Sequence, residues 1–363
     1  MKIGILGAGQ LGRMLALAGY PLDFDFVFLD PATEACAAPL GTHIHAGFDD
    51  EQALREFCVS VDVATFEFEN VAGSSAEFVA RRVPLYPPPL ALTAGQDRLH
   101  EKQLFVQLGI PVPAHAAVGS LEGLKAAVGH IGLPAVLKTR RMGYDGKGQA
   151  VLRTTADVEA AWLKLGSQPL ILEQFVPFER EVSCLAVRGK GGELRCYPLV
   201  ENVHRDGILR TAIPTVADPL QTEGEDYARR VAEHLDYVGV LAFEFFVAGG
   251  KLFANEIAPR VHNSGHWSIE GAECSQFENH LRAIAGLPLG STALRGPSAM
   301  VNLIGAAPAV AELVDLPGVH VHMYGKTPKP QRKIGHLTVT ATDRASLLAR
   351  LAPVQALVER YAS

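Results

Sequence analysis

A glycine-rich turn near the N-terminus constrains the fold of this chain more than any other feature. The sequence GAGQLG at residues 7–12 joins an apolar run at residues 2–6 to a helical pattern whose apolar residues recur on one face. A strand that enters a helix through such glycines is typical of the first unit of a Rossmann-like sheet. Strand-like runs at residues 26–29 and 61–66 alternate with helical segments, so we expect a parallel sheet here.

The same turn predicts contact with an anion. Its free backbone N–H groups and the helix dipole favour a phosphate. Asp30, at the end of the second expected strand, fits the ribose-binding position of a dinucleotide fold, so this motif alone favours NAD. The alternative without a ligand is close packing of helix against strand, which glycines also permit.

The pattern changes after the proline-rich segment 84–89. A helix is expected over residues 97–108, and from residue 135 onward longer strands with glycine-rich connections predict a mostly antiparallel α+β region. The expected strands of that region are residues 170–174, 181–188, 241–247 and 252–257, and those of the tail are residues 299–304, 319–323 and 336–341. We therefore expect three domains, at residues 1–97, 98–290 and 291–363.

Composition excludes several classes of protein. The 363 residues are 48% hydrophobic and 20% charged, which is enough for a large core. The net charge is −6 and the basic residues are scattered, so no nucleic-acid partner is expected. The five cysteines form no CxxC pair and are read as reduced thiols, and no apolar run approaches the roughly 20 residues that span a bilayer. We expect a cytoplasmic protein without a membrane partner.

A lysine at the end of an apolar strand is the second informative feature. Lys138 ends the run 135–138 and is followed by the glycine-rich segment 143–149, which contains Lys147. This combination is typical of a phosphate-binding lysine with a mobile lid. The alternative is an ordinary flexible hairpin, but a lysine in such an apolar strand is uncommon.

Two glutamates are embedded in consecutive apolar strands. Glu244 and Glu256 lie on either side of the turn Gly249-Gly250, and a hairpin would bring them to one face. Adjacent carboxylates repel unless a cation lies between them, and Mg²⁺ prefers one or two carboxylates plus nucleotide phosphates. The pair therefore predicts a Mg-ATP site. The alternative, two unrelated solvent-facing glutamates, is disfavoured by the apolar flanks.

The loop that follows concentrates polar side chains. Arg260, His262 and Asn263 suit an anionic intermediate, because Arg260 can bind it in bidentate fashion and the other two can donate hydrogen bonds. Zinc is the rival interpretation for His262 and His266. We discount it because the pair lies in a glycine-containing loop and no cysteine supports it.

Taken together, these segments resemble the ATP-grasp superfamily and, within it, the 5-(carboxyamino)imidazole ribonucleotide synthases. The resemblance covers nearly the whole chain, and its most specific segment is APRVHNSGHW at residues 258–267. The other segments that carry it are GAGQLGRML from residue 7, TFEFENV from 65, DRLHEKQLF from 97, GYDGKGQ from 143, EQFVPFEREVS from 173, NVHRDGILR from 202, SQFENHLRAI from 275 and RKIGH from 332. Met142 departs from the pattern, since many relatives have glycine there.

The resemblance implies both a fold and a reaction. The fold is α/β and α+β, an ATP-grasp fold with an N-terminal Rossmann-like pre-ATP-grasp domain and a small C-terminal domain. The reaction is carboxylation of 5-aminoimidazole ribonucleotide by bicarbonate and ATP, through carboxyphosphate, with release of ADP and phosphate in purine biosynthesis. Mg²⁺ or Mn²⁺ would be the cofactor, and the chain would form a homodimer. The glycine-rich turn would then bind the ribotide and not NAD.

The resemblance also implies site residues. Glu244 and Glu256 match the metal ligands, Arg260, His262 and Asn263 match the residues that hold carboxyphosphate, and Asp145 is the candidate for proton transfer. The ATP contacts fall on Arg98, Lys138, Gly143, Tyr144, Asp145, Gly146, Lys147, Gly148, Gln149, Glu173, Gln174, Phe175, Val176, Glu181, His204, Asn255 and Glu256. The ribotide contacts fall on Gln10, Leu11, Glu67, Asn70, Tyr144, Lys326 and Arg332.

Three other functions stay open at this point. A formate-dependent ribotide transformylase, or another ATP-grasp ligase, would share most of these residues. An NAD oxidoreductase explains only residues 7–12 and leaves Lys138 and the carboxylate pair unexplained. A nucleotide-binding module without activity gives no reason for Arg260, His262 and Asn263 beside the predicted metal site.

Overall fold

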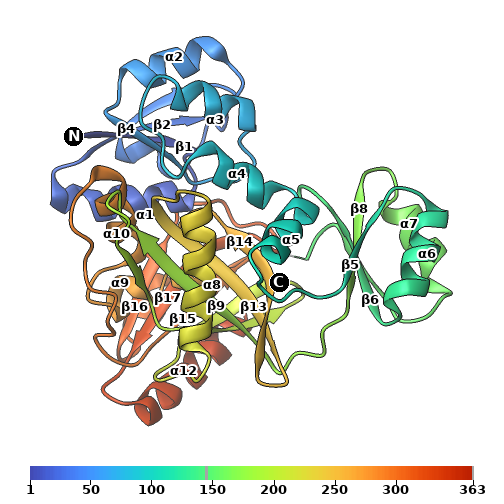
Figure 1. Cartoon of the computed structure of the whole chain (residues 1–363). Coiled ribbons are helices and arrows are strands. Elements are labelled where there is room, and N and C mark those ends of the chain that lie inside the picture. The colour runs from blue at the N-terminus through green and yellow to red at the C-terminus, as the bar shows by residue number, and fades with distance from the viewer. Residues whose placement is uncertain (144–145, 362–363) are drawn as a thin grey trace.

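The N-terminal part of the molecule is a parallel sheet covered by helices (Figure 1). The computed structural model describes residues 1–143 and 146–361. The sheet has the order β3-β2-β1-β4, with all neighbours parallel, as the sequence predicts. Its elements are β1 (Lys2–Leu6), α1 (Gln10–Gly19), η1 (Tyr20–Leu22), β2 (Asp25–Asp30), η2 (Ala38–Leu40), β3 (Thr42–His45), α2 (Glu51–Val59), β4 (Val63–Phe66) and α3 (Gly73–Ala80). The sequence pattern missed β3, because its four residues include only one fully buried side chain.

Two helices lead from this sheet to a lobe that stands apart from the body in Figure 1. The lobe is an antiparallel sheet of order β5-β8-β6-β7 with α6 and α7 packed on one face. The elements are α4 (Pro89–Gln96), α5 (Arg98–Gln107), β5 (His115–Val118), α6 (Leu121–Ile131), β6 (Ala135–Thr139), β7 (Gln149–Leu152), α7 (Asp157–Leu165) and β8 (Leu170–Gln174). Asp97 caps α5 by accepting a hydrogen bond from the amide of Leu99, so the expected helix begins one residue later.

The body of the molecule contains a nine-stranded antiparallel sheet. Its main order is β14-β13-β9-β11-β12-β15-β17-β16, and β10 pairs with β9. The strands are β9 (Arg180–Arg188), β10 (Leu194–Cys196), β11 (Val200–Arg205), β12 (Ile208–Pro214), β13 (Gly239–Ala248), β14 (Lys251–Ala258), β15 (Ser298–Ile304), β16 (Val319–Met323) and β17 (Lys333–Thr340). The helices are α8 (Gln221–His234), η3 (Asn263–Gly265), α9 (Ser268–Gly271), α10 (Gln276–Ala285), α11 (Val310–Val314) and α12 (Arg344–Glu359).

The tail strands continue the central sheet. β15 pairs with β12 at Thr211 opposite Val301, so the last three strands extend the same hydrogen-bonded surface. β17 begins three residues before the expected strand. One apolar core cluster contains Leu11 of α1, Phe277 of α10 and Tyr324 of the tail, which fixes the glycine-rich turn beside the central sheet. Among the described residues, no helix is long and apolar enough to span a bilayer.

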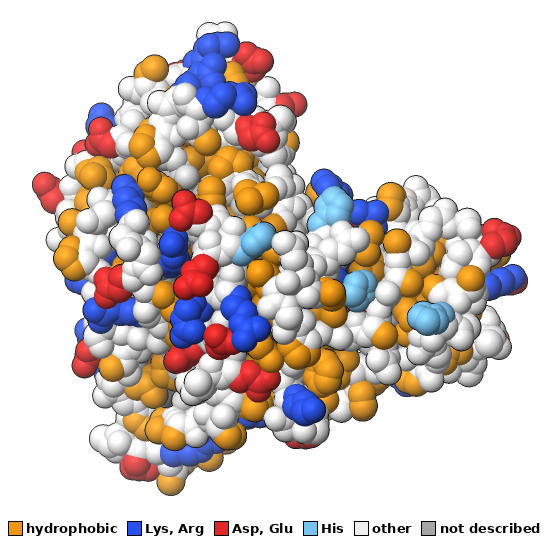
Figure 2. Space-filling view, in the orientation of Figure 1, with side chains coloured by type: hydrophobic (Ala, Val, Ile, Leu, Met, Phe, Trp, Pro, Cys, Tyr) orange, Lys and Arg blue, Asp and Glu red, His pale blue; other side chains and the backbone are white. Residues whose placement is uncertain are grey.

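A hollow separates the N-terminal part from the lobe. Figure 2 shows Lys, Arg and His side chains gathered where these two parts meet. Several of the predicted site residues come from elements that contact one another where the lobe meets the body: α5, β6, β8 and β14.

Candidate active site

A buried charge cluster lies where the lobe meets the body. Nζ of Lys138, on β6, is 2.9 Å from Oε2 of Glu173 on β8, and Nζ of Lys102 is 3.8 Å from the same oxygen. Glu173 is only 2% exposed. Burial alone would raise the pKa of Glu173, but the two lysine charges lower it to about 2. The carboxylate is therefore ionised and holds Lys138 in place.

Lys102 is a member of this cluster that sequence reasoning missed. It lies on α5, is 1% exposed, and donates hydrogen bonds to the carbonyls of Ala254 (3.0 Å) and Asn255 (2.5 Å) on β14. Its neighbour Glu101 accepts a hydrogen bond from the amide of Ile257 at 2.7 Å. Burial raises the pKa of Glu101 to about 8. The only sequence signal was their place within the DRLHEKQLF segment.

The predicted carboxylate pair lies on neighbouring strands. Glu244 of β13 is directly opposite Glu256 of β14. Burial, followed by the charge of Glu256, raises the pKa of Glu244 to about 7. Burial also acts to raise the pKa of Glu256, but the guanidinium of Arg98, 2.7 Å away, lowers it overall. A carboxylate pair in which the buried member, Glu244, resists ionisation fits a divalent cation, which would favour the ionised form of both groups.

The polar loop that follows β14 lies against this pair. Nε2 of His262 is 3.7 Å from Oε1 of Glu244. Burial, and next the charge of Arg260, holds the pKa of His262 well below its usual value, so the imidazole is neutral. Asn263 exchanges hydrogen bonds with Asn302 of β15 at 2.7 and 3.1 Å, which ties the loop to the tail strands.

Arg260 bridges this loop to the N-terminal part. Its Nη2 is 2.6 Å and its Nε 2.8 Å from Oε2 of Glu69, which follows β4. Glu69 was not among the predicted site residues, although it lies in the TFEFENV segment. The pair orients the guanidinium, and an anionic ligand would compete with Glu69 for it.

The glycine-rich turn has carboxylate partners of its own. Glu67 accepts hydrogen bonds from the amides of Gly9 (2.5 Å) and Gly12 (2.9 Å), and Asp30 accepts one from Ala8 (2.8 Å). A Cβ on Gly9 would lie 2.6 Å from the Glu67 carboxylate, so the turn requires glycine there. Asp30 therefore stabilises the turn itself, which weakens the NAD interpretation.

Two predicted ribotide residues from opposite ends of the chain meet at this turn. Lys326, in the turn after β16, donates a hydrogen bond to the Gln10 side chain, across 316 residues of sequence. Burial lowers the pKa of Lys326. Arg332 lies in the same tail turn and donates to the carbonyl of Thr327 at 3.2 Å. Leu11 is buried at the start of α1, and Asn70 is half-buried after β4.

The glycine-rich lid approaches the site from the lobe. Gly143 accepts a hydrogen bond from Arg98 at 3.3 Å, whereas Tyr144 and Asp145 lie outside the described residues. A Cβ on Gly146 would lie 3.1 Å from Cα of Gly207, so the lid is next to the β11–β12 turn. Met142 has a φ of 60°, a conformation that favours glycine, which gives a physical reason to expect glycine at this position.

The remaining predicted ATP residues follow the strand ends around this region. Oε1 of Glu181 is 3.2 Å from Nδ1 of His204, which connects β9 to β11. Among the others, Gln174, Lys147 and Gln149 are exposed, and Gly148, Phe175, Val176 and Asn255 are half-buried. These residues lie at the edge of the site. Lys138, Glu173 and Glu244 form its buried part, and Glu256 is half-buried beside them.

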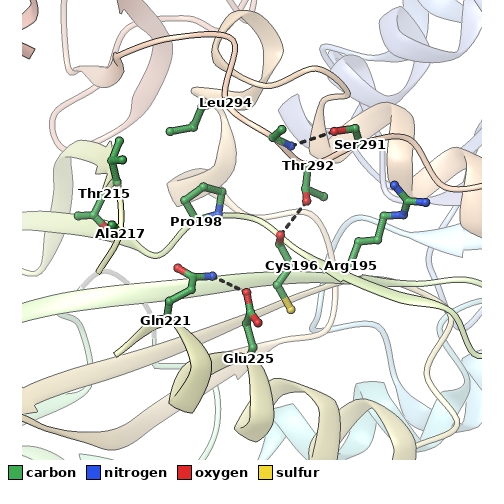
Figure 3. A pocket seen from close by; sticks show the side chains of 12 residues that line it. Arg195, Cys196, Pro198, Thr215, Ala217, Gln221, Glu225, Ser291, Thr292 and Leu294 are labelled. Atoms are coloured by element: carbon green, nitrogen blue, oxygen red, sulfur yellow. Dashed lines mark hydrogen bonds between the residues drawn. The ribbon is translucent and has the colours of Figure 1, made fainter. Parts of the chain in front are cut away.

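A separate cavity of about 620 Å³ lies on the body, between β10, α8 and the segment 291–294 (Figure 3). Its polar groups are bonded to one another: Gln221 donates to Glu225 at 2.7 Å, and Thr292 donates to the carbonyl of Cys196 at 2.7 Å. Among the described residues that line it there is no predicted site residue. We therefore do not place the chemistry there.

The fold and the buried charges define the class of protein. The profile of the ATP-grasp domain matches residues 103–277, that of the ribonucleotide synthetase preATP-grasp domain matches residues 1–96, and that of the phosphoribosylaminoimidazole carboxylase C-terminal domain matches residues 298–350. The chain is an ATP-grasp ligase with an N-terminal preATP-grasp domain.

Similar proteins identify the family within that class. The N5-carboxyaminoimidazole ribonucleotide synthase of Pseudomonas aeruginosa is 59% identical over 99% of this chain and all of its own length. The crystal structure of the synthetase from Thermus thermophilus is 54% identical, with a TM-score of 0.94 over 98% of both chains. The synthase from Aspergillus clavatus in complex with ADP and 5-aminoimidazole ribonucleotide is 32% identical, with a TM-score of 0.92 over 99% of this chain and 98% of its own. The chain belongs to the N5-carboxyaminoimidazole ribonucleotide synthase family.

Proposed function

We propose that this chain uses bicarbonate and ATP to carboxylate the exocyclic amine of 5-aminoimidazole ribonucleotide, through carboxyphosphate. Members of its family are ATP-dependent ligases of purine biosynthesis, and this chain is one of them. The single observation that carries the detailed proposal is the convergence of Glu244, Glu256 and the Arg260–Asn263 loop. This convergence supports the proposal, because two carboxylates on paired strands lie next to a loop of neutral and cationic hydrogen-bond donors.

The carboxylate pair is the proposed metal site. Glu244 and Glu256 would hold Mg²⁺ or Mn²⁺ together with the ATP phosphates. The bound ion would neutralise phosphate charge during transfer. Arg98 keeps Glu256 ionised, so at least one carboxylate is ready to bind a cation.

The lysine cluster and the lid would bind the nucleotide. Glu173, which is also paired with Lys102, holds the ammonium group of Lys138 at the edge of the lobe, where it can contact ATP phosphates. A bicarbonate oxygen would then attack the γ-phosphorus, and the bond from that phosphorus to the ADP oxygen would break. The other proposed nucleotide contacts are Gly143, Tyr144, Asp145, Gly146, Lys147, Gly148, Gln149, Gln174, Phe175, Val176, Glu181, His204 and Asn255.

The Arg260–Asn263 loop would hold the carboxyphosphate. Arg260 would exchange Glu69 for the anion, and neutral His262 would donate a hydrogen bond without adding charge. The ribotide amine would attack the carboxyl carbon and expel phosphate, and the amine would lose a proton. Asp145 is the proposed acceptor of that proton.

The ribotide would lie between the glycine-rich turn and the tail. Lys326 and Arg332 would bind its phosphate together with the amides of Gln10 and Leu11, and Glu67 and Asn70 would contact the remainder of the ribotide with Tyr144. We further propose a homodimer in the cytoplasm and a division into domains at residues 1–97, 98–290 and 291–363.

The test of this function is ADP release from Mg-ATP. We expect release to require both bicarbonate and 5-aminoimidazole ribonucleotide, and formate to be no substitute for bicarbonate. ADP release that depends on formate would show that the chain catalyses a transformylase reaction instead. Release that ignores the ribotide would remove the ribotide as the acceptor.

A further inference from the structure

A buried group of three imidazoles lies between the tail strands and the active-site loop. His336 of β17 is fully buried, and its ring stacks on that of His322 of β16, with centroids 4.4 Å apart and planes 9° apart. On another side, the ring centroid of His266 is 4.8 Å away. His322 is anchored to Glu270 of α9 at 2.8 Å. None of these side chains has a role in the proposed chemistry.

One end of this histidine cluster (His266, His322 and His336) holds the ribotide side of the site. Nδ1 of His336 is 2.8 Å from the hydroxyl of Tyr324. Tyr324 is 2% exposed, and its amide donates to the carbonyl of Ile334, so it is fixed at the point where the tail turn begins. Lys326 follows two residues later and reaches Gln10. The position of Lys326 therefore depends on Tyr324, which depends on His336.

The other end of the histidine cluster holds the carboxyphosphate side. Nδ1 of His266 is 3.2 Å from Nε2 of Gln276. The same Gln276 side chain accepts from the amide of His262 at 2.9 Å and donates to its carbonyl at 2.6 Å. His266 itself ends the η3 turn that contains Asn263. The backbone of the loop is thus clamped by Gln276 and packed against His336 through His266.

The protonation of the histidine cluster follows from these contacts. Because Gln276 uses its oxygen on the amide of His262, its nitrogen must donate to His266, and Nδ1 of His266 is the acceptor. Burial, and then the neighbouring imidazoles, hold the pKa of His266 and His336 well below their usual value. Neutral rings fix the positions of the residues that they contact by packing and hydrogen bonding, and they place no charge beside an anionic intermediate.

We propose that His336 and His266 are positioning residues that fix the Lys326 turn relative to the Arg260–Asn263 loop. Their contacts form one continuous path: Lys326 turn, Tyr324, His336, His266, Gln276, His262. The ribotide phosphate would be held at one end and carboxyphosphate at the other, so the path sets the distance between the amine and the carboxyl group. This inference rests on the proposed function.

A misplaced amine has a measurable consequence beyond lost affinity. Carboxyphosphate that is not captured by the amine is hydrolysed, so ADP forms without carboxylated ribotide. A merely structural role for the histidine cluster would lower stability and total activity but would leave the ratio of ADP to carboxylated product at its wild-type value. The ratio of ADP to carboxylated product therefore distinguishes a positioning role from a role in stability alone.

The experiment uses two variants that remove the same hydrogen bond, Tyr324→Phe and His336→Leu. We expect each to raise the KM for the ribotide about fivefold, because that is the effect of losing one neutral hydrogen bond. The KM for ATP should stay unchanged. We also expect the ratio of ADP to incorporated labelled bicarbonate to rise. Since both changes remove one contact, the double variant should be no worse than the poorer single variant.

Two further variants serve as controls. His336→Asn retains an acceptor near the position of Nδ1 and should restore part of the ribotide affinity. His320→Gln changes an exposed histidine on β16, the strand of His322, and should behave as wild type. Thermal unfolding of each variant shows whether it is folded, and Tyr324→Phe alone carries the test if His336→Leu is not.

The outcomes separate this inference from the proposed function. Wild-type values for ribotide KM and product ratio in folded Tyr324→Phe would overturn the positioning role, as would equal rises in the KM for ribotide and for ATP in that variant. In either case, the proposed function still stands if the wild-type protein turns over the ribotide and bicarbonate. If the wild-type protein releases no ribotide-dependent ADP, the proposed function and this inference both fall.

Discussion

The two sides of the active site are built in opposite ways. The nucleotide side consists of charged side chains on neighbouring strands, as with Lys138 and Glu173 in the lobe sheet or Glu244 and Glu256 in the central sheet. The ribotide side consists of segments far apart in sequence, since Lys326 meets Gln10 across 316 residues. Damage on the nucleotide side should therefore affect catalysis and folding, whereas damage on the ribotide side should affect binding and capture of the ribotide and leave the KM for ATP unchanged.

The largest effect is expected at the carboxylate pair. Glu256→Gln keeps the shape of the side chain but removes one proposed metal ligand and leaves Arg98 without its ionic partner. We expect kcat for ADP release to fall about a thousandfold, the effect of losing about 4 kcal/mol of transition-state stabilisation. The matched control is Glu233→Gln on the exposed face of α8. A fall of less than about threefold would remove Glu256 from the metal site.

The next largest effect is on stability. Lys102→Met leaves the buried Glu173 with Lys138 as its remaining lysine partner and leaves two carbonyls of β14 without a donor. We expect the free energy of unfolding, measured in urea, to fall by about 3 kcal/mol. The exposed pair of Lys125 and Glu159 provides the comparison, and Lys125→Met should unfold as wild type does. Equal stability of the two variants would show that the buried charges do not stabilise the nucleotide side.

A smaller and more selective effect is expected at the tail turn. Lys326→Met removes a charge-assisted contact to the proposed ribotide phosphate, and we expect the KM for the ribotide to rise about tenfold while the KM for ATP stays unchanged. Arg332→Ala should act in the same direction. Lys329→Met, in the same turn but exposed, should match wild type in steady-state kinetics. Equal changes in both KM values would contradict the separation of the two sides.

The smallest effect is a dependence of metal affinity on pH. Because the pKa of Glu244 is raised to about 7, this carboxyl is protonated below that pH and a cation must displace the proton. Affinity for Mn²⁺ without nucleotide should weaken as pH falls, by about fourfold from about pH 8 to about pH 6.5. Metal titrations at several pH values measure this. Constant affinity across that range would show that Glu244 is already ionised and is not opposed by Glu256.

The sequence predicted the nucleotide side better than the ribotide side for a physical reason. Glu244 and Glu256 are joined by a short Gly-Gly turn, so the alternation of the strands was enough to place them together. Lys138 was likewise predicted from a local pattern, its position at the end of an apolar strand. Lys102 was not predicted, because its burial depends on packing of α5 against β14, about 150 residues away in the sequence. No local sequence pattern encodes that contact.

Apart from the anion contact predicted for the glycine-rich turn, the residues of the ribotide side were predicted from the resemblance. No spacing rule brings Lys326 to Gln10, and the carboxylate of Glu67 on the amides of Gly9 and Gly12 could not be read from residue types. The tail strands were predicted, but their pairing with β12 was not, because β12 itself was missed. Pairings of this kind arise from the global fold.

The most direct test of the account is the fate of bicarbonate oxygen. With ¹⁸O-labelled bicarbonate, ATP and 5-aminoimidazole ribonucleotide, the phosphate released by this protein is analysed by mass spectrometry. Formation of carboxyphosphate predicts that one ¹⁸O atom per turnover appears in the phosphate, because the attacking bicarbonate oxygen stays on phosphorus when the amine takes the carboxyl group. Turnover that yields carboxylated ribotide and unlabelled phosphate would contradict the account.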